Sequence, residues 1–312
     1  MLFLKKNNVM ELVRFDWAIK RLLRNKADHV VVEGLLTVLI GKKIKINRLL
    51  ESESNQESKN DKFNRVDIRA ESEDGELMIF EIQNNRELDY FHRMAYGTSK
   101  TITEYMQLGQ PYEKIKKVYS INIVYFSLGQ GDDYAYKGTT TFVSMHNSND
   151  VLLLSKAQQD AFKCETPADI FPEYYLLRVD KFNEVANTPL DEWISYLKYN
   201  TIPDTATAPG LKEAREILRI DNLNDEEKKS YYNMMENLRY QRSVIETGRA
   251  EGRAEGRAEG RAEGRAEGEK LKAMETAQNL LKLNVLTIEQ ISQAVNLPIE
   301  KIKQLEKENK AT

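Results

Sequence analysis

The residues best suited to chemistry lie in one short segment, NRVDIRAESEDGELMIFEIQ, which spans residues 64–83. Within it Asp67, Glu81 and Gln83 alternate with apolar residues, and two alternating runs flank the pair Asp74-Gly75. An Asp-Gly pair between such runs is a strong signal for a β-hairpin. The segment therefore predicts two antiparallel strands joined by a three-residue loop, whose last residue takes the left-handed conformation that glycine tolerates.

The apolar residues fix the register of this hairpin. A loop of residues 73–75 makes one face consistently apolar, through the opposed pairs Val66–Ile82, Ile68–Phe80 and Ala70–Met78. A slip of one residue would move these side chains to the other face. The same register sets Asp67 directly opposite Glu81 on the second face, with Cβ atoms roughly 5 Å apart. Gln83 lies two residues beyond Glu81 and shares that face.

Two opposed carboxylates repel each other when both are ionised. A hard divalent cation relieves this repulsion, and Mg²⁺ is usually held by one or two carboxylates together with water and substrate phosphates. The pattern therefore indicates a divalent-metal site at Asp67, Glu81 and Gln83. The alternative is a solvated hairpin in which Arg65 or Arg69 neutralises the acids. Apolar residues on the acidic face, Leu77 and Ile79, favour the metal site.

Helices and strands in mixed order surround the hairpin. We expect helices at residues 16–25, 28–40, 86–108 and 190–197, and further strands at 43–46, 118–128, 138–145 and 174–182. Asp16 is the expected N-cap of the first helix, and Glu33 is the one acid in the apolar second helix. The third helix has apolar residues near a 3.6-residue period, including Leu88, Phe91 and Ala95. This order predicts an α/β (α+β) fold with a central mixed sheet flanked by helices.

Composition narrows the class of protein. Hydrophobic residues make up 41% of the 312 residues and charged residues 30%, which is typical of a globular chain. The net charge of -3 means that any contact with nucleic acid must come from a local basic face or from metal ions. The single cysteine excludes an intramolecular disulfide. Neither a signal peptide nor a membrane span is indicated, so we expect a cytoplasmic protein without membrane contact.

The residues in this order resemble a known family. An Asp, a hairpin and then Glu-x-Lys form the core of the PD-(D/E)xK nuclease superfamily, and here the motif reads Asp67, then Glu81-Ile82-Gln83. The Gln in place of Lys, and the downstream FHRMAYGTSK, make the chain most similar to the Rpn family of recombination-promoting nucleases and putative transposases. The resemblance covers roughly residues 12–245.

The resemblance implies a restriction-endonuclease-like fold and Mg²⁺-dependent cleavage of DNA, with Mn²⁺ able to substitute. A nuclease of mobile-element, recombination-promoting or genome-defence type is the function that it implies. Carried over by position, Asp67 and Glu81 would bind the metal. Glu33 is the candidate for a third acid from a helix, and a structural role for it is the equal alternative.

The same helix motif supplies candidate contacts to the DNA backbone, namely Arg93, Tyr96 and Lys100. Gln83 can hydrogen-bond a water molecule, but it carries no charge and is not a base. This departure from lysine leaves open a second function, a catalytically inactive nuclease-like module that binds nucleic acid or assembles. A full transposase is the weaker hypothesis, because no second catalytic domain is evident.

A domain boundary is expected near Pro203–Gly210, where prolines and small polar residues cluster. From about residue 211 the fraction of charged residues rises and the pattern becomes helical. We therefore expect a nuclease domain at residues 1–205 and a helical extension at 206–247. Residues 248–268 repeat the tetrapeptide GRAE, as a marginal helix or spacer through which copies of the chain could pair into a homo-oligomer. Residues 269–312 read as a helical hairpin with some likeness to a helix-turn-helix.

Overall fold

A computed structural model describes residues 11–50, 65–106, 108–183 and 185–310, with the backbone alone for residues 65–67 and 310. Its contacts divide the chain into two compact units, which meet between Leu238 and Arg239. The predicted surface loop at residues 51–63 lies outside the described residues. In the described part, no helix has the length and apolarity needed to cross a bilayer.

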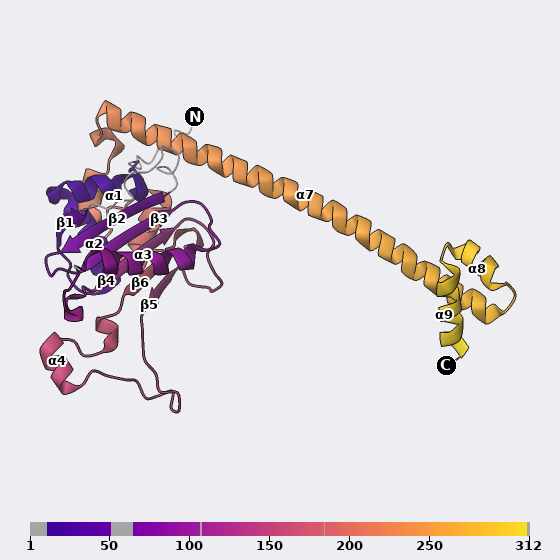
Figure 1. The fold of residues 1–312 in the computed structure, drawn as a ribbon. Coiled ribbons are helices and arrows are strands. Elements are labelled where there is room, and N and C mark those ends of the chain that lie inside the picture. Colours follow the sequence, from indigo (N-terminus) through magenta and orange to yellow (C-terminus); the bar gives the residue numbers. More distant parts are fainter. Residues whose placement is uncertain (1–10, 51–64, 107, 184, 311–312) are drawn as a thin grey trace, which may run out of the picture. The chain divides into compact units, whose positions relative to one another are not determined.

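The first unit contains a mixed sheet, and the described strands run in the order β1-β2-β3-β4-β6-β5 (Figure 1). The strands are β1 Ile46–Leu50, β2 Arg65–Ser72, β3 Leu77–Gln83, β4 Val118–Val124, β5 Ala135–Gly138 and β6 Glu173–Arg178. The central pairs β3–β4 and β4–β6 are parallel, whereas β1–β2, β2–β3 and β5–β6 are antiparallel. This mixed sheet confirms the predicted fold class.

The hairpin of β2 and β3 has the predicted register. The partners across it include Val66–Ile82, Ile68–Phe80 and Asp67–Glu81. The loop has three residues, because the Ser72 N–H donates to the Glu76 carbonyl at 2.9 Å. Gly75 has φ of 81°, the left-handed conformation that a glycine adopts without strain.

Helices pack on both faces of the sheet. The helices that lie wholly in the first unit are α1 Phe15–Arg24, α2 His29–Ile40, α3 Tyr90–Glu104, α4 Lys156–Phe162, α5 Pro189–Tyr199 and α6 Leu211–Ile217, of which α4 buries no residue. Apolar residues of α1, α2, α5 and α6 form one core with Phe80 and Ile121 of the sheet. Helix α3 covers the opposite face, where Tyr90 and Met94 pack against Val124. That second face carries Glu81 and Gln83.

The structure corrects three sequence predictions around this face. Helix α3 buries Tyr90, Met94, Thr98 and Thr101, so the apolar stripe expected through Leu88 and Phe91 was wrong. Those two side chains are 87% and 51% exposed. The strand expected at residues 43–46 is β1, Ile46–Leu50, and the strand expected at 138–145 shares only Gly138 with β5. On α3, packing against the sheet overrode the local apolar pattern.

The helical C-terminal part begins inside the first unit. Leu211, Ala214 and Leu218 belong to the main core, so the contacts of this unit continue beyond residue 205. Helix α7, Asp225–Leu283, includes the whole GRAE repeat. It is followed by α8 Ile288–Val295 and α9 Ile299–Lys310, which share a small core with the end of α7.

The helix α2 passes very close to the segment before α6, and Gly34 makes this possible. A Cβ atom at Gly34 would overlap the carbonyl group of Pro209. We expect Gly34→Ala to lower the free energy of unfolding by about 2–3 kcal/mol, since backbone must move to admit the methyl group. Urea unfolding measures the loss.

Gly97 is the matched control for this substitution, because it is also helical and has open space around its Cβ position. Gly97→Ala should leave stability unchanged or raise it by about 0.5–1 kcal/mol. Equal unfolding midpoints for the Gly34→Ala chain and the parent would contradict the close approach of the two backbones.

Candidate metal centre

The backbone of the hairpin brings the predicted acids together. Asp67 in β2 pairs directly with Glu81 in β3, as the sequence predicted. The side chain of Asp67 lies outside the described part of the structure. The register continues across the sheet, because Glu81 pairs with Asn122 of β4, and Asn122 pairs with Leu176 of β6. Residues in register share a face, so this row lies beneath α3.

Glu81 and Gln83 are buried, with 4% and 3% of their surface exposed. The Arg93 guanidinium of α3 lies over them, and its Nε atom is 2.8 Å from Oε1 of Glu81. Arg93 also forms an ion pair with Glu87, whose Oε1 accepts a hydrogen bond of 2.9 Å from Nε2 of Gln83. Four side chains therefore meet at the C-terminal end of β3. Sequence reasoning missed Glu87, which lies in the turn before α3 and had no periodic signal.

Gln83 retains an unused acceptor in this cluster. Its Nε2 donates to Glu87, which fixes the orientation of the amide. Its Oε1 is buried and has no hydrogen-bond partner among the described residues. A buried acceptor left without a partner costs free energy, so such an atom points to a ligand or an ordered water.

The donor set suits a hard divalent cation. Glu81 offers a carboxylate, Gln83 offers its free amide oxygen, and Asp67 is opposite Glu81 by register. Oxygen ligands of this kind are those that Mg²⁺ and Mn²⁺ take in proteins. Among the side chains that are described, no group of three His, Cys, Asp or Glu residues could hold a metal. A cation here would therefore depend on Asp67 and the amide as well as on Glu81.

The structure does not bring Glu33 to this cluster. Its carboxylate accepts hydrogen bonds from Lys45 Nζ at 2.5 Å and from the backbone N–H of Ile46 at 3.0 Å. Ile46 pairs with Ser72, at the opposite end of β2 from Asp67. Five residues of a strand span roughly 17 Å. These contacts show Glu33 fastening α2 to the start of β1.

A different acid reaches the end of β3. Asp16 is 4% exposed, and its Oδ2 accepts a hydrogen bond of 3.0 Å from Asn84, the residue after Gln83. It also pairs with Arg14 at 2.8 Å. Burial is the largest influence and opposes the charge of Arg14, yet the Asp16 carboxylate together with Tyr125 and Tyr231 raises the pKa of the guanidinium. The N-cap of α1 is Arg14, so the sequence reading of Asp16 as the cap was wrong.

A comparison with known families then supplies the identification. Residues 13–248 match the family described as PD-(D/E)XK nuclease family transposase. The chain belongs to this family. No curated protein matches the chain, and no solved structure matches it. Membership supports a nuclease-like or transposase-like function.

In this member of the PD-(D/E)XK nuclease family, the motif residues stand where the sequence placed them, on paired strands of a mixed sheet. The other candidate residues lie on α3. Tyr96 is 68% exposed, and Lys100 pairs with Glu104 at 3.4 Å on the same helix. Tyr96 therefore lies on the exposed side of α3, and the side chain of Lys100 is partly exposed beside Glu104.

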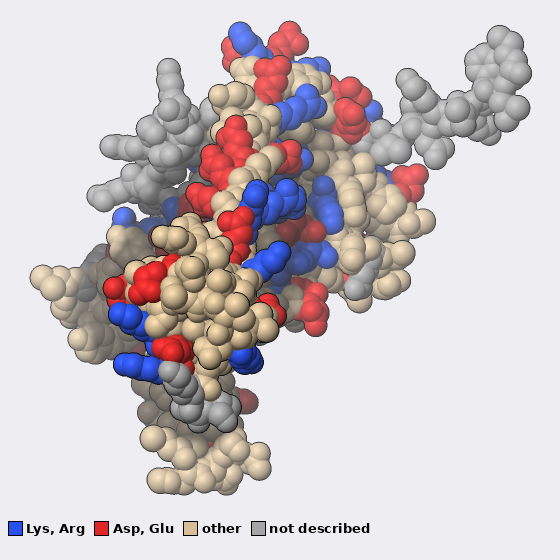
Figure 2. All heavy atoms as spheres, turned by 90° about the vertical axis from the view of Figure 1, so that its right-hand side faces the viewer, with Lys and Arg blue, Asp and Glu red and all other residues tan. Residues whose placement is uncertain are grey.

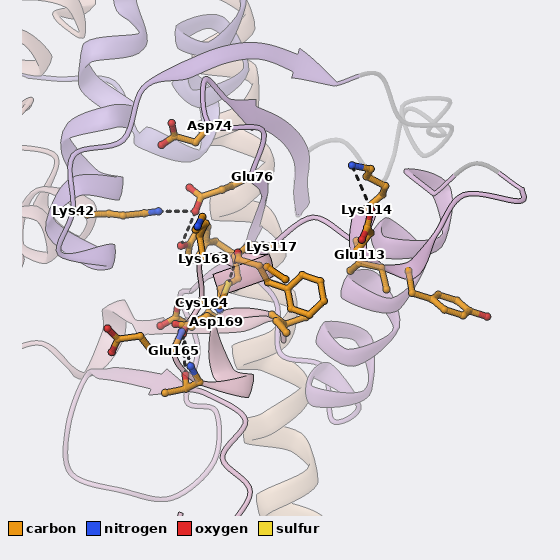
Figure 3. Close-up of a pocket in the computed structure, with 18 residues that line it drawn as sticks. Lys42, Asp74, Glu76, Glu113, Lys114, Lys117, Lys163, Cys164, Glu165 and Asp169 are labelled. Atoms are coloured by element: carbon orange, nitrogen blue, oxygen red, sulfur yellow. Dashed lines mark hydrogen bonds and ion pairs between the residues drawn. The ribbon is translucent and has the colours of Figure 1, made fainter. Parts of the chain in front are cut away.

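A larger cavity in the same PD-(D/E)XK domain lies at the other end of the strands. It has a volume of about 1050 Å³ and its charged groups largely pair with one another (Figure 3). Lys42 lies 2.6 Å from Glu76, and Lys117 donates to the carbonyls of Ala168 and Phe171. Burial is the main reason that the pKa of Lys117 is lowered. The volume of a cavity therefore does not identify the functional site. The cluster at Glu81 is the better candidate, because Gln83 there has a buried acceptor without a partner among the described residues.

At the opposite end of β2 from Asp67, Glu71 offers a test by pH. Its carboxylate accepts hydrogen bonds from Lys116 at 2.5 Å and Arg48 at 2.8 Å, and these contacts, led by Lys116, lower its pKa below the ordinary 4.5. A carboxyl with a lowered pKa in the folded state stabilises the fold above pH 4.5, and this stability is lost as the pH falls through the lowered value.

We therefore expect Glu71→Gln to reduce the difference in stability between neutral pH and pH below 4.5. Urea unfolding at both pH values measures it. Glu113→Gln is the control, because the ion pair of Glu113 with Lys114 is longer, at 3.8 Å, and exposed. If the Glu71→Gln chain loses as much stability on acidification as the parent does, Glu71 is not the carboxyl responsible for this pH dependence.

Proposed function

We propose that the chain is a divalent-metal-dependent DNA endonuclease that uses Mg²⁺, with Mn²⁺ able to substitute. The observation that supports this most is the buried, unpartnered Oε1 of Gln83 beside Glu81, in a hairpin whose register sets Asp67 opposite. Family membership supports the nuclease reaction class. Asp67 and Glu81 are the proposed metal ligands, and Gln83 completes the catalytic set.

A bound divalent cation would supply a Lewis acid that polarises the phosphodiester and activates a water molecule. Glu81 and Asp67 offer the negative charge that holds such a cation. Gln83 orients water through its amide and cannot accept a proton as a lysine amine can. Arg93 neutralises Glu81 and Glu87 when substrate is absent, and its guanidinium suits a phosphate oxygen when DNA is present.

Three further residues extend this proposal. Tyr96 and Lys100 are proposed to contact the DNA backbone from α3. Asp16 replaces Glu33 as the more favourable third acid, because it reaches Asn84 at the end of β3 whereas Glu33 is engaged at β1.

Supercoiled plasmid incubated with the purified full chain tests the function. Nicked and linear products should appear with Mg²⁺ or Mn²⁺ and disappear with EDTA. Cleavage that persists in EDTA would contradict metal dependence, and intact plasmid with every divalent cation tried would contradict the nuclease proposal.

One observation favours a second function, a catalytically silent module that binds nucleic acid. Arg93 already neutralises Glu81, and Gln83 stands where related nucleases carry lysine. Such a module would retain DNA in a gel-shift assay with Mg²⁺ present and leave it uncut. Product formation separates the two functions.

The C-terminal part is proposed to join copies of the chain in the cytoplasm. The GRAE repeat offers one Arg for each Glu, and acidic and basic side chains stand next to each other on the face in Figure 2. Balanced charge suits self-association better than phosphate binding. The molar mass of the full chain by light scattering tests this, with a monomeric mass at all concentrations as the contrary result.

A further inference from the structure

A groove lies on the face of the sheet that α3 covers, between this helix and the outer strands β6 and β5. Its volume is about 420 Å³. Phe91, Met94 and Ala95 line it from the helix, and Tyr136, Tyr174 and Leu176 line it from the sheet. A cavity of this size is within the range of small-ligand sites.

The lining is aromatic and almost free of charge. Phe91 is 51% exposed and Tyr136 is 38% exposed, so both present ring surface to a ligand. The hydroxyl of Tyr174 is engaged with Thr98 at 2.8 Å. The one charged residue beside the groove, Lys137, directs its ammonium group to Glu173 and thus away from the lining.

The walls of the groove are held in place. The Tyr136 hydroxyl accepts a hydrogen bond of 3.1 Å from the backbone N–H of Asp133. The guanidinium of Arg178 lies 5.8 Å from the centre of the Tyr136 ring. Met94 and Leu176 are each 7% exposed and belong to the core beneath α3. The groove is therefore formed before any ligand binds.

The groove lies on the same face of the sheet as the proposed metal centre, with α3 between the two. Tyr136 of β5 pairs with Leu176 of β6, Leu176 with Asn122, and Asn122 with Glu81. Residues in one such row share a face, and neighbouring strands lie roughly 4.8 Å apart, which puts the groove about 10–14 Å from Glu81. Because α3 fills the direct path, a DNA strand bound at both places would pass over the exposed side of this helix, which takes several nucleotides.

We propose that the groove binds an unpaired base of the DNA strand that is cut. Bases stack on aromatic side chains regardless of sequence, whereas bases of an intact duplex are already stacked and must first leave the helix. The substrate class is therefore DNA with a single-stranded or distorted segment next to the cut. This inference rests on the proposed function, since it assigns a substrate to the same site.

A single-stranded DNA oligonucleotide with one 2-aminopurine tests the groove by fluorescence, with the full chain in EDTA so that nothing is cut. Ala95→Phe fills the groove from α3 and should weaken binding about tenfold or more. Phe91→Ala removes one stacking surface and should weaken it at least about fivefold. Binding of a fully paired duplex should change by less than about twofold in both variants.

Two matched variants serve as controls. Thr103→Phe adds the same ring to an exposed position of α3 outside the groove, and Tyr112→Ala removes an aromatic residue that is 84% exposed elsewhere. Both should bind like the parent. Unchanged affinity in Ala95→Phe and Phe91→Ala, with circular dichroism like the parent, would overturn the proposal.

The two proposals fail in different ways. A parent chain that cuts plasmid with Mg²⁺, while both groove variants bind the single strand normally, rejects the groove and keeps the nuclease. A parent chain that cuts nothing, yet loses single-strand binding when the groove is filled, rejects the nuclease and keeps the groove as a base-binding site.

Discussion

Glu81→Gln is expected to lower the rate of plasmid cleavage by about 10³-fold, the scale on which a single electrostatic partner of the reacting group acts. The substitution keeps the shape of the side chain and removes its charge. Without that charge, Asp67 and Gln83 offer too little negative potential to hold a divalent cation. Asp67→Asn should have an effect of similar size, because the two residues are paired in the hairpin register.

The measurement is the initial rate of nicking in Mg²⁺ and in Mn²⁺, together with the affinity for Mn²⁺ by titration calorimetry. Loss of rate with unchanged metal affinity would place Glu81 outside the metal ligands. Full activity in both variants would reject the site altogether.

Glu104→Gln is the matched control for Glu81→Gln. Glu104 also lies at the interface of α3 with the sheet and forms an ion pair with an arginine, Arg69. It has no contact with Gln83 among the described residues. We expect the Glu104→Gln chain to cleave within about threefold of the parent rate. This result would separate a weaker packing of α3 on the sheet from loss of the metal site.

The hairpin could be predicted from sequence because its determinants are local. Alternation of apolar residues, one Asp-Gly turn and a loop of three residues leave a single register that keeps one face apolar. That register alone paired Asp67 with Glu81. The order of strands in the rest of the sheet could not be obtained in this way, because parallel pairs such as β3–β4 join segments separated by a whole helix.

The remaining parts of the site depend on contacts between distant segments. Nothing in the sequence near Gln83 indicates that Arg93 closes over Glu81, or that Asn84 binds Asp16. The face of α3 was misassigned for a related reason. Threonines occupy part of its buried face, where Thr98 meets Tyr174, so the apolar residues do not mark the packed side.

Asp16 should affect both stability and cleavage, and the two effects can be separated. Its carboxylate and the Arg14 guanidinium form a buried pair, with side chains 2% and 11% exposed. Asp16→Ala leaves the guanidinium without its main partner, which should cost about 3–5 kcal/mol of unfolding free energy. That is a large part of the 5–15 kcal/mol by which domains are typically stable.

The double variant Arg14→Met with Asp16→Leu removes both charges and fills the space with apolar groups. Such replacements are often neutral or stabilising, so most of the lost stability should return. If Asp16 serves the metal centre as a third acid, the double variant will be as stable as the parent and still cut DNA at least about tenfold more slowly. Recovery of stability together with full cleavage would confine Asp16 to anchoring the start of α1 against the end of β3.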